Sequence, residues 1–416
     1  MDSNKKWICR HPNESVENII LKNFGVSSAA DLNEWFKKSY ANQYTINGLK
    51  EAVEFAKKFM KSTVTIIGDY DADGTTATSI LYLGLKEYGF KDVRFRIPHR
   101  FSEGFGINEK IIDEIESGLI ITCDNGIAGL DAIKKAKGKG LAVIVTDHHK
   151  PVVIDNETVL PVADYIIDPN AIDGQAVFNG YCGAGLAYKF ICELFNFNKT
   201  IRYKYLGLAA IGTVADVMEL REENYVFVRN ALPRLSNPTY TTVGLNALIE
   251  AFDFERQITS SDIGYRIGPA INSASRMKDW GADFVVELLT FNGDKEKAAE
   301  MAQKLIRTNE LRKESEKEAM AKAKEIIEQQ NKKDNCPLIV YIPLINEGIL
   351  GIIAGNLCEK YGVPTLVFTN TLFKGEEILK GSARSCDGFN IKELFDAHAE
   401  LFIKYEIGRA SCRERV

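Results

Sequence analysis

Between residues 63 and 168, short apolar runs alternate with longer segments of helical periodicity, and this alternation limits the fold more than any other feature. In order, the apolar runs are TVTIIG, VRFRIP, LIITCD, LAVIVTD and DYIID. The segments between them, such as TTATSILYLGLKEYG and GLDAIKKAKGKG, place apolar residues three or four positions apart. Nearly continuous apolar strands separated by helices are typical of a parallel sheet with helices on both faces. The sequence therefore predicts an α/β fold with a parallel, doubly wound sheet.

The periodicity changes on both sides of this region and divides the chain into five predicted parts. Residues 1–60 are expected to form an N-terminal helical lead, and residues 61–300 the main domain, whose second half is mainly helical. Residues 301–332 carry opposite charges four positions apart, which predicts a solvated connector helix. Residues 333–405 begin a second strand–helix–strand pattern and predict a smaller α/β domain. Residues 406–416, EIGRASCRERV, fit neither pattern and are expected to be a non-native tail.

Composition places the chain among ordinary globular proteins. Its 416 residues are 45% hydrophobic and 26% charged, which is enough for two or three domains with cores. The formal net charge is −5, so binding an anionic polymer requires local basic patches or bound cations. No apolar run reaches the ~18 residues of a membrane helix, the start lacks a signal-peptide pattern, and the eight cysteines include no C-x-x-C pair. We expect a cytoplasmic protein with reduced thiols and no membrane contact.

Acidic residues and histidines follow directly after three of the predicted strands. They are Asp69, Asp71 and Asp73 after the first, Asp124 after the third, and Asp147, His148 and His149 after the fourth. The carboxyl ends of parallel strands line one crevice, which is where open α/β sheets bind ligands. A further carboxylate, Asp216, lies in the apolar stretch LGLAAIGTVADV, where an unpaired charge is costly. The sequence therefore predicts that these groups meet at one edge of the sheet.

A group of carboxylates at one edge requires positive charge, because neighbouring carboxylates raise one another's pKa unless a cation neutralises them. Oxygen ligands with one or two imidazoles suit Mn²⁺ or Mg²⁺. The number of ligands is enough for two ions, about 3.5–4 Å apart, with one carboxylate shared between them. Such a pair lowers the pKa of a bridging water and holds the oxygens of a displacement at phosphorus.

Each of these motifs has a simpler interpretation when it is taken alone. D-x-D-x-D-G also occurs in calcium loops, and Asp73 or Thr75 in this segment can cap a helix. The pair His148-His149 is compatible with a solvated loop. The joint arrangement at the ends of three strands is far more specific than any one motif, and it favours a metal site.

Four segments resemble the ordered motifs of the DHH phosphoesterase superfamily. They are GDYDADG, CDNG, TDHH and GTVADV. Other segments resemble the RecJ single-stranded-DNA exonucleases within that superfamily: IPHRFSEGFG, YCGAGLAYKF, IGPAINSASRM, GILGIIAGNLCEKYGVPTLVF and KGSARSCDGFNI. The likeness extends from about residue 15 to about residue 405. It implies that the main domain is a DHH catalytic domain and that residues 333–405 are a DHH-associated, substrate-binding domain.

The resemblance also implies a role for each residue of the predicted metal site. Asp71 and Asp73 would be metal ligands, with Asp69 beside them. Asp124 would bridge the two ions, His148 would be a ligand, and Asp216 would complete the coordination of the second ion. His149 would bind a ligand water or the scissile phosphate, and Asp147 would orient both histidines. The implied catalytic set is Asp71, Asp73, Asp124, His148, His149 and Asp216.

For the substrate, the resemblance implies a phosphate site made by both domains. Arg276 and Arg384 would hold phosphate oxygens, since a guanidinium meets them in a bidentate manner. Gly381 and Ser382 would let backbone amides approach the same anion. Judged from the residues alone, surface salt bridges are the more common role for such arginines. The connector lysines and arginines Lys304, Arg307, Arg312 and Lys313 are candidates for facing the strand, although a solvated face is their commoner role.

The sequence departs from the RecJ pattern at several positions. The usual Asn-Arg after the fourth motif is Asn224-Tyr225, and the usual Asn-Ala-Ala-Gly-Arg reads NSASR, ending at Arg276. Asn346-Glu347 stand where a histidine usually precedes the glycine of the associated domain. The Gly-Gly-His expected after ELFIKY is absent, as is any later OB-type domain. We therefore expect an intact metal centre beside a C-terminally truncated, incomplete substrate-binding domain.

The resulting prediction is a two-metal phosphodiester hydrolase, dependent on Mn²⁺ or Mg²⁺. It would act 5′ to 3′ on single-stranded DNA, release 5′-mononucleotides, and serve DNA repair and recombination. A monomer is expected, with single-strand-binding or helicase proteins as candidate partners. The first alternative is a phosphodiesterase for short oligonucleotides or cyclic dinucleotides, and the second is an inactive scaffold that binds DNA or a replication protein. Loss of the metal carboxylates would mark a scaffold, and none is lost in this sequence.

Overall fold

The structure is a computed structural model of the chain. It describes residues 14–23, 45–155, 157–329, 336–373, 376–386 and 388–403. The predicted tail at 406–416 lies outside the described residues, as do Cys9 and Cys412. None of the described helices is long and apolar enough to cross a membrane, and none of the described cysteines forms a disulfide.

The large domain is built on a five-stranded sheet with the order β2-β1-β3-β4-β7, in which every pair is parallel. The strands are β1 (Thr63–Ile67), β2 (Asp92–Arg96), β3 (Leu119–Cys123), β4 (Ala142–Thr146) and β7 (Tyr165–Ile167). All five coincide with the apolar runs that predict strands, which confirms the fold class. A short hairpin of β5 (Val152–Ile154) and β6 (Glu157–Val159) lies between β4 and β7 in the chain.

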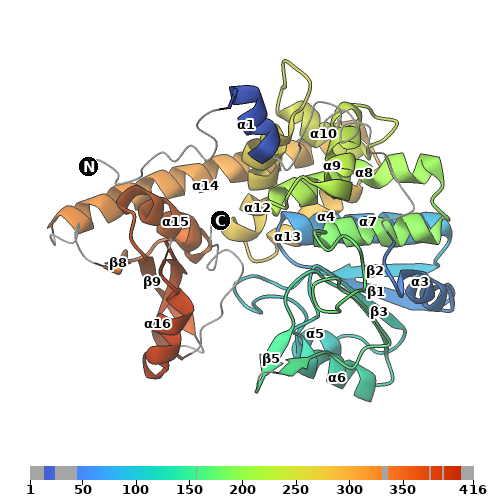
Figure 1. The fold of residues 1–416 in the computed structure, drawn as a ribbon, viewed down its shortest axis with the longest axis horizontal. Helices are drawn as coiled ribbons and strands as arrows, with labels where there is room; N and C mark the ends of the chain where they lie inside the picture. The colour runs from blue at the N-terminus through green and yellow to red at the C-terminus, as the bar shows by residue number, and fades with distance from the viewer. Residues whose placement is uncertain are drawn as a thin grey trace.

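Helices cover both faces of the sheet because successive strand residues point to opposite sides. Ile121 belongs to the core formed with α3 (Leu49–Lys57), α4 (Ala72–Tyr88), α7 (Gly183–Leu194) and α8 (Lys199–Ala215). Its neighbour Ile120 belongs to a separate core formed with α5 (Glu109–Asp113) and α6 (Leu130–Gly138). Figure 1 shows these two layers above and below the sheet.

The remainder of the large domain is helical, as predicted. Its elements are α9 (Glu222–Ala231), η1 (Leu232–Arg234), α10 (Val243–Ala251), α11 (Ser260–Asp262), the π-helical turn η2 (Ile263–Ile267), α12 (Gly268–Met277) and α13 (Gly281–Thr290). At the N-terminal end of the chain, the described part of the predicted lead contains α1 (Val16–Asn23) and α3.

The predicted connector is one helix, α14 (Lys295–Gln329), which begins before residue 301. The expectation that it is solvated is wrong for one of its faces. Ala298, Ala302 and Leu305 are buried in the large core, and Ala319, Ala323 and Ile327 in the core of the small domain. Their spacing of three or four residues forms a narrow apolar stripe between the charges. Helix α14 is therefore a structural part of both domains, and Figure 1 shows it running from one to the other.

The small domain contains a three-stranded sheet of order β10-β9-β8. Strands β8 (Leu338–Tyr341) and β9 (Thr365–Phe373) are parallel, and β10 (Glu376–Arg384) is antiparallel to β9. Helix α15 (Leu350–Tyr361) joins β8 to β9 and packs on this sheet. The other elements are η3 (Glu347–Ile349), α16 (Ile391–Ala397) and η4 (Ala399–Leu401).

Candidate metal centre

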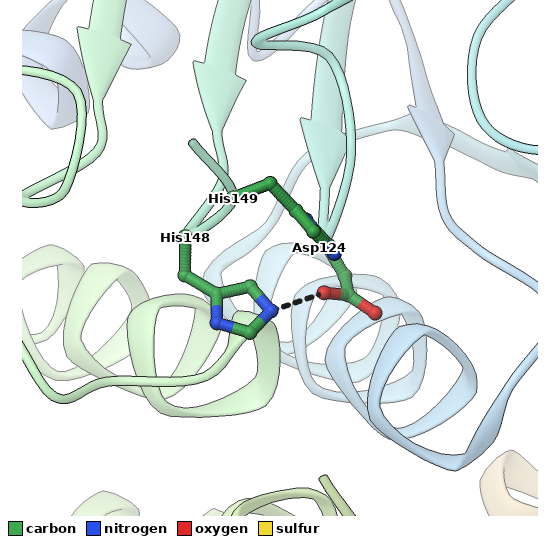
Figure 2. A group of neighbouring side chains, drawn as sticks. All are labelled: Asp124, His148 and His149. Atoms are coloured by element: carbon green, nitrogen blue, oxygen red, sulfur yellow. Dashed lines mark ion pairs between the residues drawn. The ribbon is translucent and has the colours of Figure 1, made fainter. Parts of the chain in front are cut away.

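Three parallel strands end at the same edge of the large sheet and place acidic residues there. Asp69 follows β1, Asp124 follows β3, and the segment Asp147–His149 follows β4. Asp124 has a φ of 62°, a left-handed conformation that aspartate tolerates better than most residues. Figure 2 shows Asp124 and His148 at the tips of neighbouring strands, with the histidine ring directed at the carboxylate.

The first acidic segment turns directly into helix α4, and Asp71 caps that helix. Its Oδ1 accepts hydrogen bonds from the amides of Asp73 (2.9 Å) and Gly74 (3.0 Å). The cap is therefore Asp71, whereas the sequence suggested Asp73 or Thr75. Asp71 has the extended backbone that a cap requires, while Asp73 and Thr75 already lie within the helix. Thr75 instead donates its hydroxyl to the Asp71 carbonyl oxygen at 2.7 Å.

Asp73 is fixed by the N-terminus of another helix, α7. The amide of Gly183 donates to Oδ2 at 2.6 Å, and the amide of Ala184 donates to Oδ1 at 2.8 Å. The glycine at position 183 is required here, because a Cβ on it would lie 2.4 Å from the Cβ of Asp124. Gly212 of α8 is required for the same reason, since its Cβ would lie 2.6 Å from Oδ1 of Asp73. Helices α7 and α8 therefore pack directly against the acidic side chains.

His148 brings the acidic segments together. Its Nε2 lies 2.9 Å from Oδ1 of Asp124, 3.7 Å from Oδ2 of Asp73 and 3.9 Å from Oδ2 of Asp216. Asp216 reaches the site from the C-terminal end of α8. Residues separated by more than a hundred positions thus converge on one imidazole.

Three groups in this cluster are compact enough to hold a cation, since their ligand atoms lie within 4.8 Å of one another. They are Asp69, Asp71 and Asp124; Asp73, His148 and Asp216; and Asp124, His148 and His149. Every residue that the sequence suggests as a metal ligand belongs to at least one group. Asp124 and His148 belong to two, which places them between the groups.

Asp147 lies behind the cluster and orients the histidine segment. Its Oδ1 lies 2.7 Å from Nδ1 of His149 and accepts hydrogen bonds from the amides of His148 and His149. Its Oδ2 accepts from the amide of Ile127 at 2.9 Å. Burial alone would raise the pKa of Asp147, but the hydrogen bond from His149 and the charges of both histidines hold it below its usual value. The Asp147 carboxylate therefore holds the His149 ring at Nδ1 and the His148 backbone at the His148 amide.

The carboxylates of the cluster are electrostatically frustrated. Burial raises the pKa of Asp124 well above its usual value, and repulsion from Asp73 and Asp71 adds to this effect. Burial and the charge of Asp71 likewise raise the pKa of Asp69 and of Asp73. Oδ1 of Asp69 is buried with no hydrogen-bond partner in the described part of the chain. Oxygen ligands without protein donors are the arrangement that a divalent cation satisfies.

The two arginines that the sequence suggests for substrate binding belong to different domains. Arg276, in α12, is half-buried and donates from Nη1 to the carbonyl oxygen of Gly348 in the small domain at 3.1 Å. Burial, with the positive charge of Arg100 and smaller effects of Arg312 and Arg384, lowers the pKa of Arg276 to about 9. Like charges close enough to have this effect form a site that an anion would stabilise.

On strand β10, Arg384 donates from Nη1 to the Ala383 carbonyl oxygen at 2.7 Å and lies 3.4 Å from Oγ of Ser382. Gly381 also has a packing reason to be glycine, because a Cβ there would lie 2.5 Å from the ring of Phe368 on β9. Of the suggested connector cations, Arg312 is buried and pairs with Glu316 at 2.7 Å, and Lys304 lies over the Phe284 ring at 4.5 Å. Arg312 and Lys304 therefore have structural partners.

Several residues near the site were not identified by sequence reasoning. Arg100 lies over the ring of Tyr70 at 4.8 Å, beside the first acidic segment. Phe105 is 44% exposed, and its ring centroid lies 5.5 Å from that of His149. Asp168 follows β7, so the rule that located the other acidic residues could have found it. Arg100 and Phe105 lie in the segment IPHRFSEGFG, but nothing in their spacing indicates that this loop folds over the cluster.

Comparison with known proteins identifies the family of this chain. Residues 63–213 match the model of the DHH family, N-terminal domain. The single-stranded-DNA-specific exonuclease RecJ of Salmonella typhimurium is 30% identical over 406 residues, which are 92% of this chain and 68% of that protein. The chain belongs to the RecJ family. The RecJ of Haemophilus influenzae is 32% identical over 88% of this chain and 66% of its own length.

Solved RecJ structures agree with this assignment. A crystal structure of exonuclease RecJ bound to manganese superposes with a TM-score of 0.75 at 28% identity, covering 88% of this chain and 89% of that one. RecJ from Thermus thermophilus in complex with Mn²⁺ superposes with a TM-score of 0.77 at 26% identity, covering 94% of this chain and 54% of that one. The chain spans about two thirds of the length of the curated RecJ relatives that it matches first.

Proposed function

We propose that this chain is a metal-dependent phosphodiester hydrolase that removes 5′-mononucleotides from the 5′ end of single-stranded DNA. The observation that carries the proposal is the convergence of Asp69, Asp71, Asp73, Asp124, His148, His149 and Asp216 at one sheet edge, in groups of ligand atoms within 4.8 Å. Relatives named as single-stranded-DNA-specific exonucleases support the substrate. Related structures that contain Mn²⁺ or Mg²⁺ support the choice of cation.

The residues present fit two divalent cations. The site offers carboxylate oxygens and imidazole nitrogens, which suit Mn²⁺ and Mg²⁺. Asp69 contributes a buried oxygen that has no hydrogen-bond donor among the described residues. Asp69, Asp71 and Asp124 would hold one ion, and Asp73, His148 and Asp216 the other, with Asp124 shared. When bound, such a pair supplies an activated water and stabilises the negative charge that develops on the phosphate oxygens.

The protein's own groups prepare the site before the substrate arrives. The amides of Gly183 and Ala184 hold the Asp73 carboxylate at a fixed angle. The hydrogen bond between Nδ1 of His149 and Asp147 fixes the ring through that nitrogen, and Nε2 is the ring nitrogen that would contact a water or the scissile phosphate. Fixing these groups in advance reduces the reorganisation needed in the transition state.

Substrate phosphates would be held by Arg276 and Arg384, with Ser382 and the backbone at Gly381 beside them. The mutual repulsion of Arg276 and Arg100 would be relieved by an anion, in the same way that cations relieve the acidic cluster. A phosphodiester bound between the arginines and the cations would neutralise the arginines directly, while the cations neutralise the carboxylates of the acidic cluster. We also propose that the protein acts as a monomer in the cytoplasm and works with single-strand-binding or helicase proteins.

The decisive experiment measures manganese-dependent hydrolysis of a 5′-labelled single strand, its duplex and a cyclic dinucleotide, for the wild-type protein and Asp124→Ala. We expect release of mononucleotides from the single strand only, and no turnover by Asp124→Ala. Preferential turnover of the cyclic dinucleotide would instead support a small-substrate phosphodiesterase. Tight binding of the strand without turnover of any substrate would support a scaffold. Equal activity of the wild-type protein and Asp124→Ala would refute the assignment of the centre.

A further inference from the structure

Two asparagines outside the four acidic motifs bond to the backbone of the segments that carry the ligands. We propose that Asn170 and Asn272 are positioning residues, which fix these two segments in the geometry that binds the cations. The inference rests on the proposed function, because it assigns them a role in that same site. Neither touches the reacting atoms in this proposal; each acts through a peptide group.

Asn272 secures the first acidic segment from helix α12. Its Oδ1 accepts a hydrogen bond of 2.8 Å from the amide of Ala72, the residue between Asp71 and Asp73. Ala72 is the first residue of α4, so its amide has no partner within the helix. Asp71 already accepts from the amides of Asp73 and Gly74. Asn272 therefore completes the cap, and it does so from 200 positions further along the chain.

Asn170 secures the histidine segment from the loop after β7. Its Nδ2 donates a hydrogen bond of 2.7 Å to the carbonyl oxygen of His148. The other end of that peptide group, the amide of His149, donates to Oδ1 of Asp147 at 3.1 Å. Both polar atoms of the peptide between the two histidines are thus held. A rotation of this peptide would change the direction of both rings, so Asn170 controls the two together.

The position of Asn170 is itself fixed by a chain of contacts. Its amide donates to Oδ1 of Asp168 at 2.9 Å. The amide of Asp168 donates in turn to Oε1 of Gln175 at 2.7 Å, and Nε2 of Gln175 donates to the carbonyl oxygen of Ile166 in strand β7. The bond to His148 is therefore anchored to the sheet and does not depend on a mobile side chain.

The two asparagines use opposite ends of the amide group, and this difference makes the proposal testable. A backbone N–H can only donate, so Asn272 must accept through its oxygen; a carbonyl can only accept, so Asn170 must donate through its nitrogen. Replacement by aspartate keeps an acceptor and removes the donor. Asn272→Asp retains its bond to Ala72, whereas Asn170→Asp places an oxygen against the His148 carbonyl oxygen.

The experiment measures Mn²⁺ binding without DNA, by the electron paramagnetic resonance signal of free Mn²⁺, together with kcat and KM on a single strand. The variants are Asn170→Asp, Asn170→Ala, Asn272→Asp and Asn272→Ala. The control is Asn230→Ala, since the Asn230 side chain bonds only to the Val226 carbonyl oxygen of its own helix in the described structure. Thermal unfolding of each metal-free variant reports its structural cost.

We expect Asn170→Asp, Asn170→Ala and Asn272→Ala to weaken Mn²⁺ binding about 10- to 100-fold and to lower kcat more than they raise KM. Asn272→Asp should bind Mn²⁺ within about threefold of the wild type, because its added charge cannot repel a cation. Asn230→Ala should leave binding unchanged. If an alanine variant fails to fold, the two aspartate variants still decide the question.

Two results would overturn the inference. One is Mn²⁺ binding by all four variants that equals that of Asn230→Ala; the other is a loss in Asn272→Asp as large as the loss in Asn272→Ala. Both presuppose that the wild-type protein binds Mn²⁺. Absence of Mn²⁺ binding and of hydrolysis in the wild type would count against the proposed function itself, which separates the two failures.

Discussion

Two groups of like charges in this molecule are built in different ways. The acidic cluster consists of the carboxylates around His148, and the arginine cluster consists of Arg100, Arg276 and Arg384. Most of the acidic residues follow adjacent strands of one sheet and Asp216 ends helix α8, and Asp69, Asp73 and Asp124 are buried. The arginines come from a loop, from helix α12 and from strand β10 of the second domain. Asp73 is held by two backbone amides, whereas Arg276 donates to the Gly348 carbonyl oxygen of the small domain and Arg384 to that of Ala383, its neighbour in β10.

This difference indicates how each cluster responds to its ligand. The acidic cluster is part of the core of one domain, so its geometry is set when that domain folds. The arginine cluster depends on the contact between domains, where a Cβ on Gly348 would lie only 2.1 Å from the Arg276 carbonyl oxygen. We therefore expect changes in the acidic cluster to affect the chemical step, and changes in the arginine cluster to affect the binding of the strand.

The largest effect is expected from Asp216→Asn, which removes the charge of a proposed ligand while preserving the shape of the side chain. Loss of a cation that contributes several kcal/mol to the transition state lowers kcat about 1,000-fold or more. The measurement is single-turnover hydrolysis at saturating Mn²⁺. Asp253→Asn is a matched control, because Asp253 is exposed at the end of α10 and its positive φ of 48° suits asparagine. Comparable losses in both variants would contradict a special role for Asp216.

A smaller effect, mainly on KM, is expected from Arg276→Gln. Charge-assisted hydrogen bonds contribute about 1.5–3 kcal/mol, so KM for a single strand should rise about 10- to 100-fold. The assay compares strands with a 5′-phosphate and a 5′-hydroxyl. Arg94→Gln serves as the control, since the Arg94 side chain is 67% exposed and pairs with Asp92. A fall in kcat with no change in KM would remove the distinction between the two clusters.

The acidic cluster could be predicted from sequence because one rule, that parallel strands end at a shared edge, places Asp69, Asp124 and Asp147 together without knowledge of any side-chain contact. Asp168 obeys the same rule after β7 and was overlooked because it stands apart from any recognised motif. The buried face of α14 was mistaken for a solvated one, since alanines such as Ala298 and Ala302 give a weak apolar signal among many charges.

Contacts between distant polar groups could not be predicted in this way. Asn272 and Asn170 bond to backbone atoms, and backbone atoms carry no sequence signal that would identify the partner. The proximity of Arg276 to Arg100 likewise depends on how α12 packs beside the first acidic segment. Sequence reasoning reached the proposed ligands that follow strands because those strands share a sheet edge, and it reached Asp216 through its motif; it missed the groups that tertiary packing brings to that edge.

The pH dependence of Mn²⁺ binding tests whether the acidic cluster is frustrated. Asp69, Asp73 and Asp124 have raised pKa values, so the metal-free folded protein retains protons that the unfolded chain releases above about pH 4. The metal-free protein should therefore lose stability as the pH rises from 5 to 8. Mn²⁺ displaces those protons, so the increase in Tm that saturating Mn²⁺ produces should grow over the same range. An increase that is constant or shrinks with pH would contradict this account.

The smallest effect is expected from Asp168→Asn, and it concerns stability alone. Burial, with repulsion from Asp147, raises the pKa of Asp168 to about 8. Its contribution to stability is therefore complete below about pH 4, declines above it, and is lost as the pH passes 8. Asparagine keeps the oxygen that accepts from the amides of Asn170 and Ala171, and it removes the titration.

Metal-free Asp168→Asn should consequently have a Tm close to that of the wild type at pH 5 and a Tm a few degrees higher at pH 8. Asp131→Asn, at an exposed position of α6, should follow the wild type at both pH values. A Tm for Asp168→Asn that falls below that of the wild type at pH 8 would mean that the ionised carboxylate stabilises the loop. In that case the hydrogen bonds from the amides of Asn170 and Ala171 would outweigh burial and the repulsion from Asp147, and the pKa of Asp168 would be lowered instead of raised.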